Sequence, residues 1–351
     1  MNHLPASQRF PGLKLLVAIA SFMVVVAGIM SAQTFLVPIL FSLFLAVLGT
    51  PAVGMLMRMK FPKIIAVLTV ALIFIAILVG VGTLLGRSVN EFTTSMPKYT
   101  ERVNELSHGF QVWLKEQGIP TLENGFFASI KPDSVMDLVG TALRGLVSAL
   151  SSTMMVFIVM GFMLFEAADF RDKLRFAMGE AFNQERFEGV AHDVQRYLAI
   201  KTATSAITGF LVGAFNFGMG IDFWLLWGII AYIMNYIPFV GSILASFPAI
   251  ILALVQFGFP AAITVAIVYL IINVGVSNFL EPIMMGRRLG LSPLVVFLSL
   301  VIWGWIWGPA GMLLSVPLTM VFKILLEHSE EFRWIAILMD NRPENVPDVT
   351  A

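Results

Sequence analysis

Long apolar runs, separated by short polar segments, extend along most of the chain. They occupy residues 13–30, 35–57, 64–86, 146–165, 197–218 and 259–284. Each run has close to the roughly 20 residues that a helix needs to cross the hydrocarbon core of a bilayer. The pattern predicts an all-α polytopic membrane protein with about six full spans.

Two further apolar stretches are interrupted by proline and glycine. The first break is NYIPFVG at 235–241, and the second is WGPAG at 307–311. Proline removes a backbone donor and glycine loosens the chain, so each break predicts two short helical arms instead of one span. Arms of about 12–17 residues reach only about 18–26 Å, which is short of a full crossing. They fit re-entrant hairpins or short tilted pairs.

The two breaks belong to a sequence repeat. YLAIKTATS at 197–205 matches YLIINVGVS at 269–277, and further on Gly241 matches Gly311. Each repeat unit is therefore expected to contain one spanning helix followed by a helix, a break and a second helix.

Basic residues set the expected orientation, because short loops rich in Lys and Arg stay in the cytoplasm. The basic turn at 58–63 places both termini inside. Lys201 near the start of one repeat span, and Arg287 and Arg288 at the end of the other, are then also inside, so the two units are inverted. Interruptions at matching places in inverted repeats are the best sequence pointer to a transporter's substrate site.

The chain divides into consecutive segments on this basis. They are 1–86, with spans one to three; 87–145, an extracytoplasmic amphipathic helical insert; 146–196, a fourth span and a cytoplasmic linker; 197–258 and 259–328, the two repeat units; and 329–351, a cytoplasmic tail. The first apolar run is kept as a span and not a cleaved signal peptide, because it is long and no A-x-A site follows it.

The outer insert carries its own apolar pattern. Steps of three and four residues join Val89, Phe92, Met96, Tyr99, Val103, Leu106, Phe110 and Trp113. This is an a/d heptad seam, interrupted by Pro97, which suits a fresh helix start after Thr94 or Ser95. The seam packs either onto its own protomer or onto another subunit, and the sequence leaves both open.

Composition agrees with a membrane protein and excludes several functional classes. The chain of 351 residues is 58% hydrophobic and 13% charged, with a mean hydropathy of +0.88; soluble domains carry about 25% charged residues. Without cysteine it has neither a disulfide framework nor a thiolate metal site. Its four histidines are scattered, and it has neither a P-loop nor a nucleophile constellation. We therefore expect no enzyme, cofactor or metal, and no nucleic-acid partner.

Three long stretches also resemble a known family. NYIPFVGSILASFP, NFLEPIMMGRRLGLSPLVVFLSL and WGWIWGPAGMLLSVP are similar to stretches of the autoinducer-2 exporter family, and are most like those of its quorum-signal-exporting members. The resemblance implies a bacterial inner-membrane protein without a nucleotide-binding domain that exports autoinducer-2. Other members resemble cation/proton antiporters. The resemblance also implies a homo-oligomer.

Glu281 is the only acid between Asp222 and Glu327. Ser277 and Asn278 precede it by four and three residues, so α-helical spacing puts all three on one face. An intramembrane carboxylate is a candidate for proton or cation handling. These three residues form an expected substrate- or ion-binding group.

The alternative for Glu281 is a structural ion pair with Arg287 or Arg288, which follow it closely. These two arginines and Lys201 are assigned to orientation or gating. We expect Lys201 to extend its ammonium group to the cytoplasmic interface.

The other candidate site residues lie at the breaks. They are Asn235, Tyr236, Pro238 and Gly241 in the first, and Trp307, Gly308, Pro309 and Gly311 in the second. The Asn235 amide suits a hydroxylated ligand or a neighbouring helix. Tyr236 and the tryptophans suit a furanose-like ligand, although interfacial anchoring is favoured.

Three hypotheses follow. The first is export of a small polar signal, autoinducer-2, with Glu281 coupling protons or ordering the site. The second is Na⁺(Li⁺)/H⁺ antiport through Glu281, Asn278 and Ser277. The third is an oligomeric membrane scaffold. Expected partners are the signal molecule, the lipid bilayer, a coupling proton or sodium ion, and further copies of the chain through the 88–117 helix or the membrane faces.

Overall fold

The computed structural model describes residues 11–117, 140–141, 145, 154–178, 184–285, 291–327 and 332–340. This part is entirely helical and contains no strand. Its elements are α1 (Pro11–Ser31), α2 (Gln33–Arg58), α3 (Lys63–Glu116), α6 (Met154–Met178), α7 (Gln184–Met219), α8 (Trp224–Met234), α9 (Val240–Phe257), α10 (Phe259–Gly275), the π-helix η3 (Val276–Leu280), α11 (Glu281–Met285), α12 (Pro293–Glu327) and α13 (Arg333–Met339). The predicted all-α class is confirmed.

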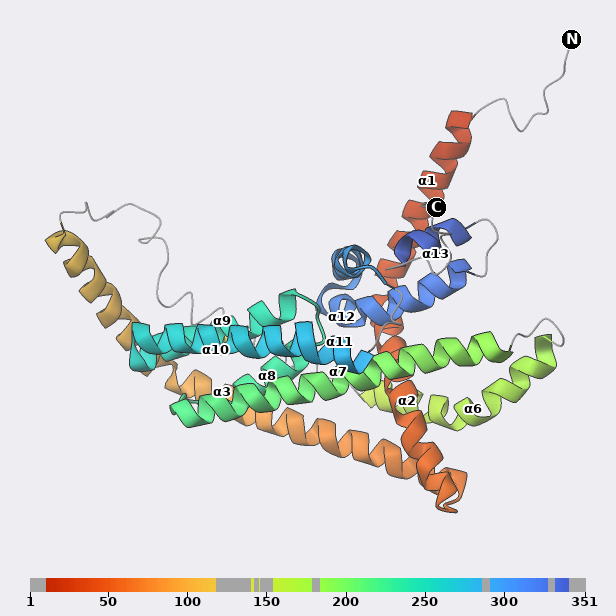
Figure 1. The fold of residues 1–351 in the computed structure, drawn as a ribbon, viewed down its shortest axis with the longest axis horizontal. Helices are drawn as coiled ribbons and strands as arrows, with labels where there is room; N and C mark the ends of the chain where they lie inside the picture. Colours follow the sequence, from red (N-terminus) through yellow and green to blue (C-terminus); the bar gives the residue numbers. More distant parts are fainter. Residues whose placement is uncertain are drawn as a thin grey trace, which may run out of the picture.

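The long helix α7 is the axis of the fold. Its 36 residues make a rod of about 54 Å, and it packs against α8, α10, α11, α12 and α2. In Figure 1 it runs beside α10, which itself lies side by side with α9. Elements that are far apart in the sequence therefore pack their side chains against the same helix, α7.

Six helical segments of the described residues are long and apolar enough to cross a membrane. They are α2, the first part of α3, the second part of α7, α9, α10 with its continuation to Met284, and α12. The number of spans agrees with the six expected from the sequence, but the helices that make up the six differ. α9 and α12 were expected as interrupted pieces, whereas α1 and α6 contribute the shorter stretches Ile19–Ser31 and Met155–Ala167.

The predicted helix start at Pro97 is wrong, because this residue lies inside α3, which is 54 residues long and continues past it. The hydroxyl of Thr94 donates to the carbonyl of Asn90 at 2.8 Å, so it bonds within the same helix instead of capping a new one. Phe92 and Tyr99, on either side of Pro97, pack into one cluster with α7, α8, α9 and α10. This shared packing keeps the helix together, and the boundary expected at residues 86/87 falls inside it.

The seam of the outer segment packs on its own protomer where its side chains are described. Val89, Phe92 and Tyr99 are buried against α8 and α9, and Met96 and Val103 pack at the edge of that cluster. The side chains of Leu106, Phe110 and Trp113 lie outside the described part of the structure, as do residues 118–139 and 146–153.

The first break is present where the sequence placed it. α8 ends at Met234 and α9 begins at Val240. Phe239, with φ 61°, has a conformation that non-glycine residues rarely adopt. A Cβ on Gly241 would overlap the Met234 carbonyl group, so glycine is needed for α9 to start this close to the end of α8.

The second break has the same local geometry. α12 kinks at Trp307 and Gly308, whose backbones are not helical, and Gly308 has φ 61°. A Cβ on Gly311 would overlap the Trp303 carbonyl group. Both interruptions are therefore confirmed, each with a glycine against the last turn of the preceding arm. The inverted relationship of the two units stays a prediction.

Candidate functional site

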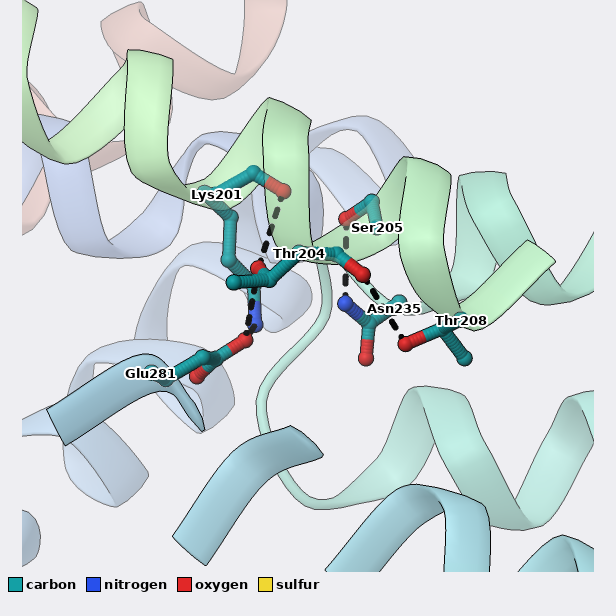
Figure 2. Close-up of polar contacts among 6 residues, drawn as sticks. All are labelled: Lys201, Thr204, Ser205, Thr208, Asn235 and Glu281. Atoms are coloured by element: carbon teal, nitrogen blue, oxygen red, sulfur yellow. Dashed lines mark hydrogen bonds and ion pairs between the residues drawn. The ribbon is translucent and has the colours of Figure 1, made fainter. Parts of the chain in front are cut away.

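A buried ion pair lies at the centre of the molecule. The ammonium nitrogen of Lys201 on α7 is 2.5 Å from Oε1 of Glu281 on α11. Their side chains are only 6% and 14% exposed. Figure 2 shows the two side chains reaching across the gap between their helices.

Two expectations about these residues are corrected by this geometry. Lys201 does not extend to the interface, because Glu281 holds its ammonium inside the protein. The ion-pair alternative for Glu281 is realised with Lys201, which lies 80 positions away. Arg287 and Arg288, the partners that the sequence suggested, lie outside the described residues.

A stripe of hydroxyl groups continues from Lys201 along α7. Thr204, Ser205 and Thr208 follow it at helical spacing, so they share its face, and all three are at most 1% exposed. The Thr204 hydroxyl lies 3.1 Å from Oε1 of Glu281, as Figure 2 shows. The Thr208 hydroxyl donates to the carbonyl of Thr204 at 3.0 Å. The carboxylate thus has two polar neighbours from a single helix.

The first break brings its amide side chain to this stripe. Asn235 follows the last residue of α8, is 4% exposed and donates from Nδ2 to the Ser205 hydroxyl at 3.0 Å. α8 can approach α7 this closely because glycines meet at the contact, where a Cβ on Gly209 would lie 2.7 Å from the carbonyl oxygen of Gly228.

Tyr236 adds a second link between the break and α7. Its hydroxyl donates to that of Thr202 at 2.8 Å and lies 3.3 Å from the hydroxyl of Tyr232. The side chain is therefore hydrogen-bonded inside the protein and is not an anchor at the membrane interface. Pro238 is half-buried beside it.

The π-helix η3 sets the direction of Glu281. It covers Val276–Leu280 and ends immediately before the carboxylate, and single π-turns inside α-helices are frequent at functional sites. The expectation that Ser277 and Asn278 share a helix face with Glu281 assumed α-helical spacing. With the wider turn, Asn278 is exposed and Ser277 is partly exposed, while the partners of Glu281 come from α7.

The second break lies against the N-terminal helices and not against the polar centre. The indole nitrogen of Trp307 donates to the carbonyl of Ile29 on α1 at 3.1 Å, and Gln33 of α2 donates to the Trp307 carbonyl at 3.4 Å. Trp307 is 3% exposed, which excludes an interfacial anchor for this residue. Gly308 is partly exposed and Pro309 is exposed.

Sequence reasoning missed several polar residues of this region. They are Thr202, Thr204, Ser205, Thr208 and Tyr232. The signal was present in IKTATSAIT, where hydroxylated residues recur at the spacing of one helix face beside a lysine.

The polar centre, defined here as Lys201, Thr204, Ser205, Asn235 and Glu281, offers both hydrogen-bond donors and acceptors in apolar surroundings. Such a set can bind a small hydroxylated solute or exchange a proton. No group of three or more His, Cys, Asp or Glu residues that could hold a metal occurs in the described part of the chain.

Comparison with known proteins gives a consistent result. The family model described as AI-2E family transporter matches residues 16–331. The chain is 37% identical to the AI-2 transport protein TqsA of Escherichia coli K12 over 335 residues, 94% of this chain and 96% of that protein. It is 34% identical over 340 residues to YhhT of the same organism, a candidate transport protein, covering 95% and 96%. A candidate transport protein of Haemophilus influenzae is 34% identical over 335 residues, covering 92% and 95%.

Proposed function

The chain belongs to the AI-2E transporter family, and from this we propose that it exports a small polar signal, autoinducer-2, across a bacterial inner membrane. TqsA, to which it is 37% identical, is named for AI-2 transport. The proposal includes a multi-pass protein with both termini in the cytoplasm, the orientation that the basic turn at 58–63 favours.

The observation that carries the proposal is the junction of a helix break with a buried ion pair. Asn235 at the break reaches Ser205, one residue beyond Thr204, which contacts Glu281. Freed backbone groups at a break are tolerated in a membrane only where protein buries them or water reaches them. A hydroxylated solute entering here replaces hydrogen bonds that the protein otherwise makes internally.

In this mechanism Glu281 orders the site and couples it to a proton. With Glu281 ionised, Lys201 and Thr204 hold the carboxylate. Protonation removes the charge that Lys201 pairs with, so α11 and α7 are released from each other and the solute can pass between them. The breaks at 235–241 and 307–311 are the points at which the short arms move.

The second candidate function is Na⁺(Li⁺)/H⁺ antiport, and one observation favours it. Glu281 is a carboxylate with one hydroxyl neighbour, Thr204, and such oxygen ligands suit a hard cation. The ammonium of Lys201 at 2.5 Å opposes this reading, because a bound cation there is repelled.

An oligomeric scaffold acting through the outer part of α3 is the third candidate. Val89, Phe92 and Tyr99 are buried against their own chain. This part of the seam is therefore not exposed for contact with another subunit. If copies of the chain associate, their membrane faces are the better surface.

The test is uptake of autoinducer-2 into everted membrane vesicles, in which export appears as accumulation. The proposed exporter gives uptake that a protonophore abolishes and that vesicles without the protein lack. Absence of uptake together with sodium-induced alkalinisation of the vesicle lumen contradicts the proposal and supports the antiporter.

A further inference from the structure

A polar cavity lies at the end of α7 that is remote from the ion pair. Its volume is about 440 Å³, within the range of about 300–1,000 Å³ that is usual for small-molecule sites. Residues from the outer part of α3, the loop after α7 and the last turn of α9 line it, among them Lys98, Tyr99, Arg102, Asp222 and Gln256.

The floor of the cavity is a connected set of hydrogen bonds. The Tyr99 hydroxyl donates to Oδ2 of Asp222 at 2.7 Å, and the backbone N–H of Asp222 donates to Oε1 of Gln256 at 3.2 Å. The Trp227 indole nitrogen donates to the Asp222 carbonyl at 3.0 Å. Asp222 is thus fixed by three other elements of the fold and cannot turn freely.

Packing beneath the floor keeps the loop in an unusual shape. Phe223 has φ 59°, a left-handed conformation that costs a non-glycine residue about 1–3 kcal/mol. Its ring contacts those of Phe92 and Tyr99 edge to face, with centroids 5.7 and 6.4 Å apart. The cavity is therefore preformed, which lowers the entropy lost when a ligand binds.

The chemistry of the lining selects a kind of ligand. The lining carries two basic residues, Lys98 and Arg102, and three acidic ones, Glu101, Glu105 and Asp222, so it does not favour an anionic ligand. The Gln256 amide contributes an acceptor oxygen and N–H donors, and the Asp222 carboxylate contributes acceptor oxygens. Donors and acceptors side by side, with charges of both signs, suit a small neutral solute that carries several hydroxyl groups.

The cavity is separate from the polar centre. Gly220, in its lining, follows Lys201 by 19 positions, which corresponds to about 28 Å along a helix. This is close to the roughly 30 Å thickness of a bilayer core. A small solute cannot touch both places at once, so the cavity and the polar centre are distinct places in the fold.

We propose that this cavity is a second binding site for the transported solute, a small neutral polyhydroxylated molecule, at the opposite end of the path from the Lys201–Glu281 pair. The inference rests on the proposed function. It assigns to the outer part of α3 a direct role in solute binding, with Gln256 and Lys98 as ligand-contacting residues.

Titration calorimetry of the full-length protein in lipid nanodiscs tests this, with autoinducer-2 as the probe. Wild type is expected to bind two molecules per chain, and Gln256→Leu is expected to retain one. Lys98→Met changes an exposed side chain on the rim and leaves the floor bonds intact; we expect it to weaken the outer site roughly tenfold. Asn90→Leu, which removes an exposed amide earlier on α3, is the matched control and should bind as wild type does.

Failures of the two proposals are distinguishable. If wild-type vesicles transport autoinducer-2 but the protein binds one molecule per chain and neither Gln256→Leu nor Lys98→Met changes binding, the second site is refuted and the exporter stands. If wild type neither transports nor binds autoinducer-2, the proposed function itself fails. Stronger binding of citrate than of autoinducer-2 at the outer site overturns the assignment to neutral solutes.

Discussion

The ammonium of Lys201 and the carboxylate of Glu281 meet at 2.5 Å although 80 positions separate them in the chain. This pair joins α7, the axis of the fold, to α11 directly after a π-helical turn. Thr204 contacts the same carboxylate oxygen as Lys201. The central site is therefore built between two helices from different parts of the chain, α7 and α11, and not within either one.

Breaking the ion pair from one side should be costly. Glu281→Leu or Lys201→Met leaves an uncompensated buried group, so each is expected to lower the free energy of unfolding by about 3–5 kcal/mol. The double variant Lys201→Met with Glu281→Leu removes both charges and is expected to lie within about 1 kcal/mol of wild type. Unfolding in mixed micelles measures all three. A double variant as unstable as the sum of the single ones contradicts the pairing.

The glycines of the two breaks should not tolerate a methyl group. In Gly241→Ala and Gly311→Ala the new Cβ meets a backbone carbonyl of the preceding arm, so a loss of at least about 1–3 kcal/mol is expected. Gly218→Ala is the matched control, since open space surrounds that position and alanine favours the helix by about 0.5–1 kcal/mol. Equal stability of Gly241→Ala and Gly218→Ala speaks against the close approach at the break.

The continuity of α3 predicts the effect of replacing its proline. Pro97→Ala restores a backbone N–H inside the helix, and the unfolding free energy should rise by as much as about 3 kcal/mol. A destabilised Pro97→Ala protein indicates instead that proline starts a new helix there. Thr94→Val serves as the control, because it removes only a hydroxyl bonded within the same helix.

The hydrogen bond between Asn235 and Ser205 should appear as a coupling energy. A double-mutant cycle of Asn235→Ala and Ser205→Ala isolates the pair, and interhelical polar contacts in membranes average about 0.6 kcal/mol. Thermal unfolding of the four proteins measures this value. Strict additivity shows that the break and α7 do not interact through these side chains.

The helix breaks and most helix locations follow from the sequence because their causes are local. Proline and glycine interrupt the helix at residues 235–241 and 307–311 through their own backbone properties, which do not depend on how the rest of the chain packs. The hydroxyl stripe beside Lys201 was also accessible through its helical spacing, although it was not predicted.

Other features depend on packing between distant elements, which no local pattern records. The partner of Glu281 was sought among the neighbouring arginines, but the fold supplies Lys201 from another helix. The π-turn at η3 has no residue signature, and Asn278 within it is exposed while the partners of Glu281 come from α7. Pro97 is a local signal for a helix start, yet the common cluster beneath Phe92 and Tyr99 outweighs it.

The central claim is that Glu281 in the buried pair couples solute export to protons. Its most direct test is protonophore-sensitive uptake of autoinducer-2 by everted vesicles that contain equal amounts of wild type, Glu281→Gln or Glu166→Gln. Glu166 pairs with Lys173 in an exposed position, so its variant makes the same chemical change outside the site. We predict full uptake by wild type and Glu166→Gln, and a loss of about 10- to 100-fold in Glu281→Gln, the range expected for a lost charged hydrogen bond. Undiminished, protonophore-sensitive uptake by Glu281→Gln would contradict the account.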